Sequence, residues 1–199
     1  TATTEIYTLS LHDALPISAC TTISIEESNF LNPDQKAQVT KLRKIEQTAT
    51  TEDITINGFD DVTLSGTLIK VDNAQATVIY FGGNQFRVSV AGGKLAQHIL
   101  PMNVNILMVD HRGYGNSEGT PTIENLKRDA LSVYDYVATR TDLKSTPTIL
   151  HGHSLGSMIA GYVASERPAD ALVLEGSITN VKQMTSQRMP WFVKPFVEV

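Results

Sequence analysis

Runs of apolar residues separated by turn residues divide the chain, from about residue 54 onward, into predicted strands and helices. Residues 62–71 alternate between apolar and polar positions, and they follow a short apolar stretch and the turn Asn57-Gly58. Alternation with a period of two beside an Asn-Gly turn predicts an antiparallel hairpin at one edge of a sheet. Four continuous apolar runs then predict parallel strands buried on both faces: residues 76–81, 104–109, 148–150 and 171–174.

Segments with a helical period lie between these runs. Apolar side chains in residues 121–139 recur at steps of three and four, which indicates one buried helix face. Residues 88–100 and 155–166 show the same pattern. Residues 33–49 are polar with a thin apolar stripe, so we expect a surface helix there, with Asn32-Pro33 at its start.

The order of these elements predicts the fold class. A hairpin followed by β-α-β-α-β-α-β is typical of an α/β protein, in which right-handed crossovers place helices on both faces of a mostly parallel sheet. Ligands bind such sheets at the carboxyl ends of the strands. The loops that follow Phe81, Val109, Leu150 and Leu174 are therefore the candidate sites.

Composition and charge narrow the classes of function. The chain has 199 residues, 16 Lys and Arg against 21 Asp and Glu, and 41% hydrophobic residues, as expected for a globular domain. A net charge of −5 argues against binding to a nucleic-acid backbone. The single cysteine, Cys20, excludes an internal disulfide and a cysteine-rich zinc site. No apolar run reaches the roughly 18 residues of a membrane span.

The most specific motif is His151-Gly152-His153-Ser154-Leu155-Gly156. It places Gly-x-Ser-x-Gly between a predicted buried strand and a predicted amphipathic helix. In this context the glycines permit a sharp turn that holds the serine in a strained conformation at the N-terminus of the helix. Ser154 is therefore our candidate nucleophile.

An acyl-transfer site also needs hydrogen-bond donors for the oxyanion. The backbone N–H of Leu155, which follows the candidate nucleophile, is the first candidate. The loop after Phe81 contains two glycines, and we expect the second donor to be the N–H of Asn84, with Gln85 next in order. An ordinary tight glycine turn is the alternative interpretation of this loop.

With these residues in place, the chain resembles an α/β-hydrolase. Residues 78–84 (VIYFGGN) resemble the strand that family members end with Tyr-Phe-His-Gly-Asn, and residues 109–119 (VDHRGYGNSEG) resemble their Asp-x-Arg-Gly-x-Gly-x-Ser loop. The match covers about residues 54–180. It departs from the family at Gly82, where members carry a histidine that supports the oxyanion loop.

The remaining ionisable residues are interpreted as structural. The resemblance implies that Asp110 and Arg112 tie their loop down and take no part in catalysis. The backbone turn keeps a residue next to the nucleophile from reaching its hydroxyl, and four histidines are expected to have packing roles: His98, His111, His151 and His153. No histidine and carboxylate cluster has metal-ligand spacing, so we predict no metal and no cofactor.

In the α/β-hydrolase fold the triad runs Ser, then Asp or Glu, then His. Four acidic residues and no histidine follow Ser154 in this chain. Residues 189–197 (MPWFVKPFV) resemble the opening of the lid that often follows the sixth strand. We therefore expect the chain to stop before the last two strands, the triad acid and the base.

The first residues are expected to lie outside the domain. Residues 1–17 resemble a translated sequencing adapter, so we expect residues 1–18 to be an artefact without packed structure. Residues 19–50 are predicted to be a leader or tether with a surface helix, and residues 51–199 a partial hydrolase domain. Ser18-Ala19-Cys20 resembles the end of a lipoprotein signal, which implies membrane attachment through a lipidated Cys20 in the bacterial cell envelope, at the outer membrane. The alternative is an ordinary cysteine in a cytoplasmic protein.

Together these features predict a serine hydrolase that cleaves an ester, thioester or amide of a small-molecule or peptide substrate through an acyl-enzyme on Ser154. The chain itself is expected to be inactive because it lacks the base. Two alternatives stay open: an acyltransferase or peptidase on the same scaffold, and a binding protein that keeps the serine turn for structural reasons.

Overall fold

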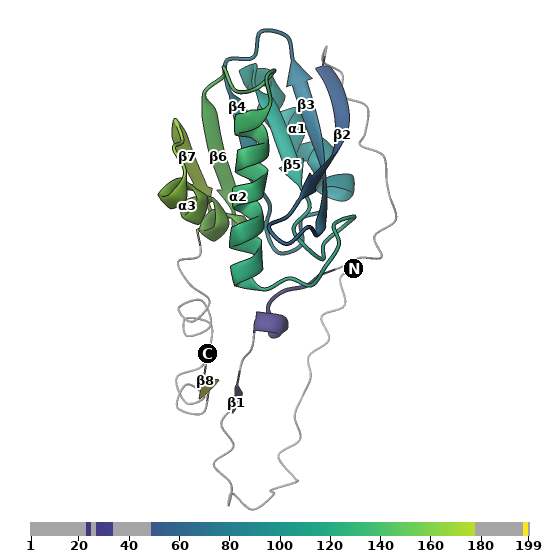
Figure 1. Cartoon of the computed structure of the whole chain (residues 1–199), viewed down its shortest axis with the longest axis vertical. Coiled ribbons are helices and arrows are strands. Elements are labelled where there is room, and N and C mark those ends of the chain that lie inside the picture. The colour runs from purple at the N-terminus through teal and green to yellow at the C-terminus, as the bar shows by residue number, and fades with distance from the viewer. Residues whose placement is uncertain (1–22, 25–26, 34–48, 178–196, 199) are drawn as a thin grey trace, which may run out of the picture.

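A computed structural model of the chain describes residues 23–24, 27–33, 49–177 and 197–198. Figure 1 shows a twisted sheet with helices packed along it. The strands are β1 (Ile23–Ser24), β2 (Ala49–Asn57), β3 (Thr63–Val71), β4 (Thr77–Phe81), β5 (Asn105–Val109), β6 (Thr148–His153), β7 (Ala171–Glu175) and β8 (Val197–Glu198). The helices are α1 (Gly93–Ile99), α2 (Ile123–Thr139) and α3 (Leu155–Glu166), with short turns η1 (Glu27–Asn29), η2 (Val88–Gly92) and η3 (Leu100–Met102).

Six strands form the main sheet, in the order β2-β3-β5-β4-β6-β7. β3 pairs antiparallel with β2 and with β5, and the pairs from β5 to β7 are all parallel. At the centre, Ile79 lies between Leu107 and Leu150, and all three side chains are fully buried. The predicted α/β fold with a mostly parallel sheet is confirmed. β1 and β8 pair separately over two residues.

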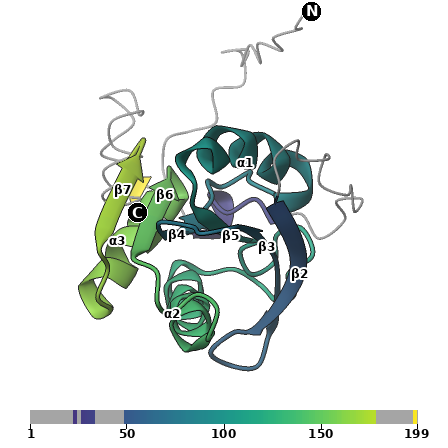
Figure 2. The same ribbon diagram turned by 90° about the horizontal axis from the view of Figure 1, so that it is seen from above.

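Helices cover both faces of the sheet. Figure 2 shows α1 on one face and α2 with α3 on the other. Consecutive strand residues point to opposite faces, so Val78 and Ile106 belong to the core beneath α1, whereas Ile79 and Leu107 belong to the core shared with α2 and α3. The continuous apolar runs arise because both faces of these strands are buried.

The predicted elements are present, and several of their boundaries differ by a few residues from the apolar patterns. The predicted helix 155–166 coincides with α3, and α2 begins at Ile123, where the Thr122 hydroxyl caps the helix by accepting from the Asn125 N–H at 3.1 Å. β2 begins at Ala49, before the apolar pattern does, because its first residues lie at the partly exposed edge of the sheet. The rest of the predicted surface helix lies outside the described residues.

The expectation that residues 171–174 are buried on both faces is wrong for β7. Leu172, Val173 and Leu174 are 41%, 44% and 46% exposed. Within the described part of the chain, β7 has only β6 as a neighbouring strand. An end strand keeps one edge open, so an apolar run alone does not tell an end strand from a central one.

The loop after β5, residues 110–119, is fixed by a buried ion pair. The Arg112 guanidinium donates to both carboxylate oxygens of Asp129 on α2, each at 2.7 Å, and to Asp60 at 2.6 and 2.9 Å. The side chains of Arg112 and Asp129 are only 3% and 5% exposed. Hydrogen bonds from Arg112 to the two carboxylates raise its pKa further above its ordinary value. Arg112 thus has a structural role, tying the loop to α2 and to the β2–β3 turn.

Replacing Arg112 with alanine is expected to lower the free energy of unfolding by about 3–5 kcal/mol, because the variant leaves the Asp129 carboxylate buried without its cation. The measurement is urea denaturation followed by circular dichroism. A loss below about 1 kcal/mol would show that water or another group replaces Arg112 at no cost.

Arg167→Ala is the matched control. Arg167 also donates to both oxygens of an aspartate, Asp135, at 2.8 and 3.0 Å, but these side chains are 33% and 50% exposed. Water screens this pair and can solvate the aspartate that remains. We therefore expect a much smaller loss than for Arg112→Ala.

Candidate active site

Ser154 lies where β6 passes into α3. Its backbone angles, φ 53° and ψ −115°, fall in a region that residues with a side chain rarely adopt. Hydrogen bonds on both sides maintain this conformation: the Ser154 N–H donates to the Glu175 carbonyl at 2.8 Å, and the Ser154 carbonyl accepts from the N–H and the hydroxyl of Ser157 at 3.0 and 2.6 Å. The strained turn predicted from the motif is therefore present.

The glycines of the motif permit close packing. A Cβ atom on Gly152 would lie 2.2 Å from the Gly156 carbonyl oxygen, and one on Gly156 would lie 1.9 Å from the Phe81 carbonyl oxygen. No side chain fits at either position. As a result the start of α3 lies against the end of β4, and a Cβ atom on Gly83 would be 3.4 Å from that of Ser154.

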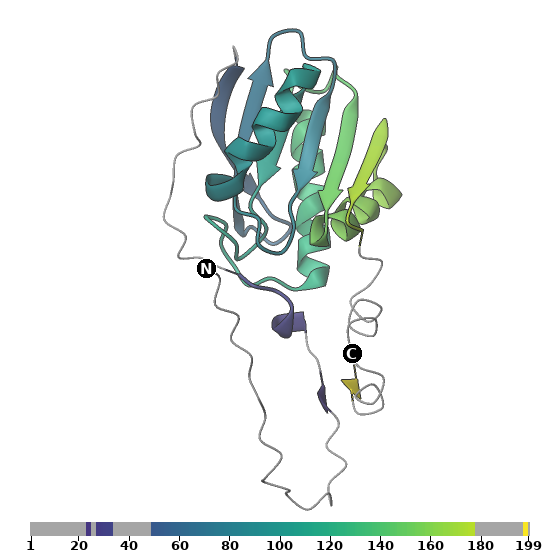
Figure 3. The same cartoon turned by 180° about the vertical axis from the view of Figure 1, so that it is seen from behind.

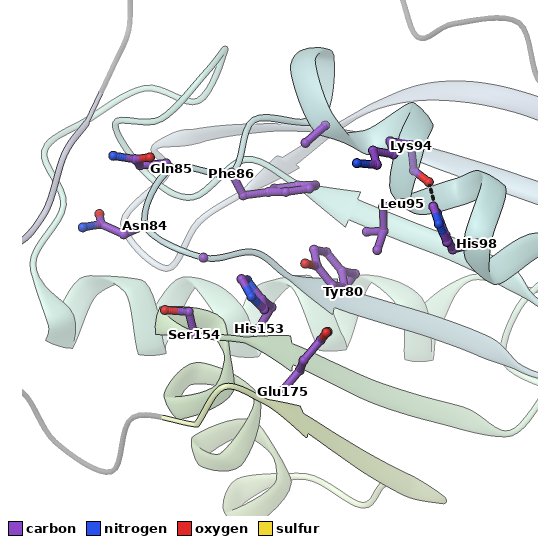
Figure 4. Close-up of a pocket in the computed structure, with 12 residues that line it drawn as sticks. Tyr80, Asn84, Gln85, Phe86, Lys94, Leu95, His98, His153, Ser154 and Glu175 are labelled. Atoms are coloured by element: carbon purple, nitrogen blue, oxygen red, sulfur yellow. Dashed lines mark hydrogen bonds between the residues drawn. The ribbon is translucent and has the colours of Figure 1, made fainter. Parts of the chain in front are cut away.

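The candidate oxyanion donors lie next to Ser154. Asn84 and Gln85 line the same pocket as Ser154, on the loop that follows β4 (Figure 4). Leu155 is the first residue of α3, so its N–H belongs to the first turn, where amides have no partner within the helix. The structure thus brings together the loop and helix start named from the sequence, and the donor role of each N–H stays a prediction.

The pocket extends from Ser154 past the end of β4 to α1 and has a volume of about 680 Å³. Burial, with a contribution from the Glu175 carboxylate, raises the pKa of Tyr80 to about 12, so its phenol stays protonated in neutral water. Besides Ser154 and the loop after β4, the wall has aromatic and aliphatic side chains, those of Tyr80, Phe86, Ala91 and Leu95. It also has four ionisable side chains, those of Lys94, His98, His153 and Glu175. The apolar wall was not identified from the sequence, because nothing local marks Tyr80 and Phe86 as pocket residues.

Among the residues that the structure describes, none forms a hydrogen bond with the Ser154 hydroxyl. His98 contacts the Lys94 carbonyl of its own helix, Nδ1 to O 2.7 Å (Figure 4). The ring of His151 packs edge-on against Tyr80, with 5.1 Å between centroids. His153 is exposed at the pocket. None of these contacts joins a described histidine to the Ser154 hydroxyl.

Asp110 and His111 connect the loops around the pocket. The buried Asp110 carboxylate accepts from the N–H groups of Val88 and Asn116 at 2.8 and 3.2 Å, and burial raises its pKa. His111 Nε2 lies 2.9 Å from the Gly82 carbonyl oxygen, which can only accept, so we assign the proton to Nε2. Burial lowers the pKa of His111, which keeps the ring neutral.

Gly82 stands where the resemblance implies a histidine, and the structure shows what fills that space. A Cβ atom on Gly82 would lie 2.4 Å from atoms of the Phe86 ring, so a side chain does not fit there. His111 contacts the backbone of the same residue from the neighbouring loop. This contact between segments 29 residues apart has no local signal in the sequence.

The described part of the chain holds no group of three potential metal ligands and no helix long and apolar enough to cross a membrane. Cys20 and residues 1–18 lie outside it, so lipidation stays a prediction. Of the carboxylates after Ser154, Asp170 accepts from the Thr148 N–H at 2.7 Å, and Glu175 lines the pocket.

Stability is expected to fall as pH falls below about 6.5, in part because of His111. Its folded-state pKa lies below the ordinary 6.5, so between the two values the unfolded chain binds a proton that the folded chain does not. This contribution is complete above about pH 6.5 and is lost as the pH falls through that window. Urea denaturation at several pH values between about 7.5 and 5.0 measures the slope.

His111→Gln is the comparison for this prediction, because glutamine keeps an N–H donor for Gly82 but does not titrate. The slope of stability against pH should be flatter in the variant. Asp110, whose pKa is raised, contributes in the opposite sense in both proteins, so its effect cancels in the comparison. Equal slopes in the two proteins would contradict the prediction.

The chain is similar in sequence to known hydrolases. A family model described as "serine aminopeptidase, S33" (Hydrolase_4) matches residues 72–199. An uncharacterized protein of Salmonella typhi, YfhR, is 35% identical over 159 residues, which cover 71% of this chain and 54% of that protein. The lysophosphatidylserine lipase ABHD12 of Macaca fascicularis is 31% identical over 120 residues, which cover 56% of this chain and 29% of that protein.

Among solved structures, an esterase of Pyrococcus furiosus has the same fold, with a TM-score of 0.66 at 23% identity, covering 85% of this chain and 69% of that one. The chain spans about half the length of the first curated relatives it matches. The family model covers most of the chain and the strand order agrees with the fold. The chain therefore belongs to the Hydrolase_4 family (serine aminopeptidase, S33) of the α/β-hydrolase superfamily.

Proposed function

We propose that the chain carries the nucleophile and the oxyanion loop of a serine hydrolase, which cleaves its substrate through an acyl-enzyme on Ser154. The observation that carries this proposal is the strained backbone of Ser154 at the wall of the pocket. Strain of this kind lowers stability and is typical of functional sites. A serine kept only for packing has no need of it.

In the proposed reaction the Ser154 oxygen attacks the carbonyl carbon of the substrate, and the carbonyl oxygen becomes an oxyanion. The N–H groups of Leu155 and Asn84, with Gln85 as the alternative to Asn84, donate to that oxyanion. The first turn of α3 adds its partial positive charge. The leaving group departs with the proton that the serine lost, and water then hydrolyses the acyl-enzyme.

The general base and its acid are proposed to come from parts of the hydrolase domain that this chain does not span. Two facts support this: no histidine follows Ser154, and the relatives are about twice as long as the matched region. The order Ser, acid, His in this fold is consistent with it.

We propose that the substrate is a carboxylic ester with an apolar part. The side chains of Tyr80, Phe86 and Leu95 offer an apolar wall beside Ser154 that fits an acyl or alkyl chain. Two of the similar proteins are named as a lipase and an esterase, which favours esters, whereas the name of the family model keeps amides open.

In a version extended by the rest of the hydrolase domain, Ser154→Ala should lower kcat/KM for p-nitrophenyl esters by about a thousandfold or more, because triad members act as a unit. It should also abolish labelling by a fluorophosphonate probe. Ser165→Ala is the matched control: Ser165 lies on the same helix, and its hydroxyl donates only to the Tyr162 carbonyl at 2.7 Å. Undiminished labelling of the Ser154→Ala protein would place the nucleophile elsewhere, and an unlabelled parent protein would favour a binding role.

The chain as printed should not hydrolyse p-nitrophenyl esters in a manner that depends on Ser154. A serine hydroxyl is a weak nucleophile without a base to take its proton, and no described residue forms a hydrogen bond with the Ser154 hydroxyl. The measurement compares the printed chain with its Ser154→Ala variant at equal concentration. Turnover that disappears in the variant would require one of the existing histidines, with His153 first, to act as the base.

A further inference from the structure

Residues 27–33, which we call the strap, cross the carboxyl ends of the central strands. Figures 1 and 3 show η1, the first turn of the strap, just beyond these ends. The strap precedes β2 by more than a dozen residues, yet it contacts the loop that carries the candidate oxyanion donor.

The side-chain amide of Asn84 joins the strap to the loop. Its oxygen accepts from the Tyr114 hydroxyl at 2.6 Å and from the Asn32 N–H at 3.0 Å. Its nitrogen donates to the Phe30 carbonyl. The Asn32 N–H also lies 3.1 Å from the Tyr114 hydroxyl. One amide thus meets two strap residues and a tyrosine of the loop after β5.

Three further contacts fix the strap itself. Leu31 is 4% exposed and belongs to the core shared with α2 and α3. The Glu27 carboxylate accepts from the Ile123 N–H, the first residue of α2, at 2.8 Å. The buried Arg87 donates to the Asn32 carbonyl at 2.9 Å, with its guanidinium 4.6 Å from the centroid of the Tyr114 ring.

The loop has few side chains of its own with which to hold its shape. Its first two residues are Gly82 and Gly83, and Gln85 is exposed. On one side, His111 donates to the Gly82 carbonyl. On the other side the strap contacts Asn84, so residues from outside the loop fix both Gly82 and Asn84.

We propose that the strap is a positioning element of the active site: through Phe30 and Asn32 it orients Asn84, and with it the oxyanion donor. This inference rests on the proposed function, which assigns the Asn84 N–H the role of oxyanion donor. The strap residues touch no reacting atom. They act by keeping the donor aligned, and a misplacement of about 1 Å in such a site costs about a hundredfold in rate.

Leu31→Ala tests the proposal, because it weakens the packing of the strap against the core without changing a residue of the loop. Leu143→Ala is the matched control, because Leu143 is 1% exposed and belongs to the same core but is not part of the pocket lining. In the extended hydrolase domain we expect Leu31→Ala to lower kcat for p-nitrophenyl esters by about tenfold or more with KM within about twofold, and Leu143→Ala to leave both unchanged.

Hydrogen exchange of peptides covering residues 80–90, measured on the printed chain, gives a readout that needs no catalysis. Exchange should be about tenfold faster in Leu31→Ala than in Leu143→Ala. A second, less disruptive variant serves if Leu31→Ala does not fold. Tyr114→Phe removes a hydroxyl that is bound to Asn84. Its control is Tyr134→Phe, which removes a hydroxyl that is bound to the Pro168 carbonyl. Of these two, only Tyr114→Phe should speed exchange in the loop.

Unchanged loop exchange in both Leu31→Ala and Tyr114→Phe would overturn the proposal. So would an equal loss of kcat in Leu31→Ala and Leu143→Ala, since that loss would reflect general destabilisation. Failure of the proposed function gives a different result. In that case turnover or labelling survives in the Ser154→Ala protein, while loop exchange still differs between Leu31→Ala and Leu143→Ala.

Discussion

The start of α3 lies so close to the end of β4 that a Cβ atom on Gly156 would be 1.9 Å from the Phe81 carbonyl oxygen. This contact sets the distance between two turns that belong to different strands of the sheet. One turn holds Ser154 in its strained conformation, and the other begins the glycine loop. Parallel strands end at the same edge of the sheet, so the close contact between α3 and β4 is enough to place the two turns at one pocket.

Strain at Ser154 must be maintained by the structure around it. The Glu175 carbonyl and Ser157 fix its backbone on both sides. Farther out, the Arg112 ion pair fixes the loop after β5, which in turn supplies His111 and Tyr114 to the glycine loop. The buried ion pair therefore acts on the pocket indirectly, through the loops that it stabilises.

The strap changes how the segment before the sheet is understood. A polar stretch ahead of the first long strand has the composition of a tether, and the apolar residues in it are few. Yet Leu31 is buried in the main core, and Asn32 and Phe30 bond to Asn84. Residues 27–33 thus pack as part of the hydrolase domain.

The sequence alone was sufficient for the α/β class, the strand order along the chain and the turn at Ser154, because these depend on local apolar periods and on glycines at fixed spacing. It could not distinguish β7 from the central strands, since an apolar run reports hydrophobicity and not the number of neighbours. It also could not show that Phe86 fills the space beside Gly82, that His111 bonds to the Gly82 carbonyl, or that the strap holds Asn84. Those contacts join residues that are distant in the sequence or depend on how a loop folds back. Only the packed sheet brings them within hydrogen-bond distance, because such bonds form over about 3 Å in space whatever the separation along the chain.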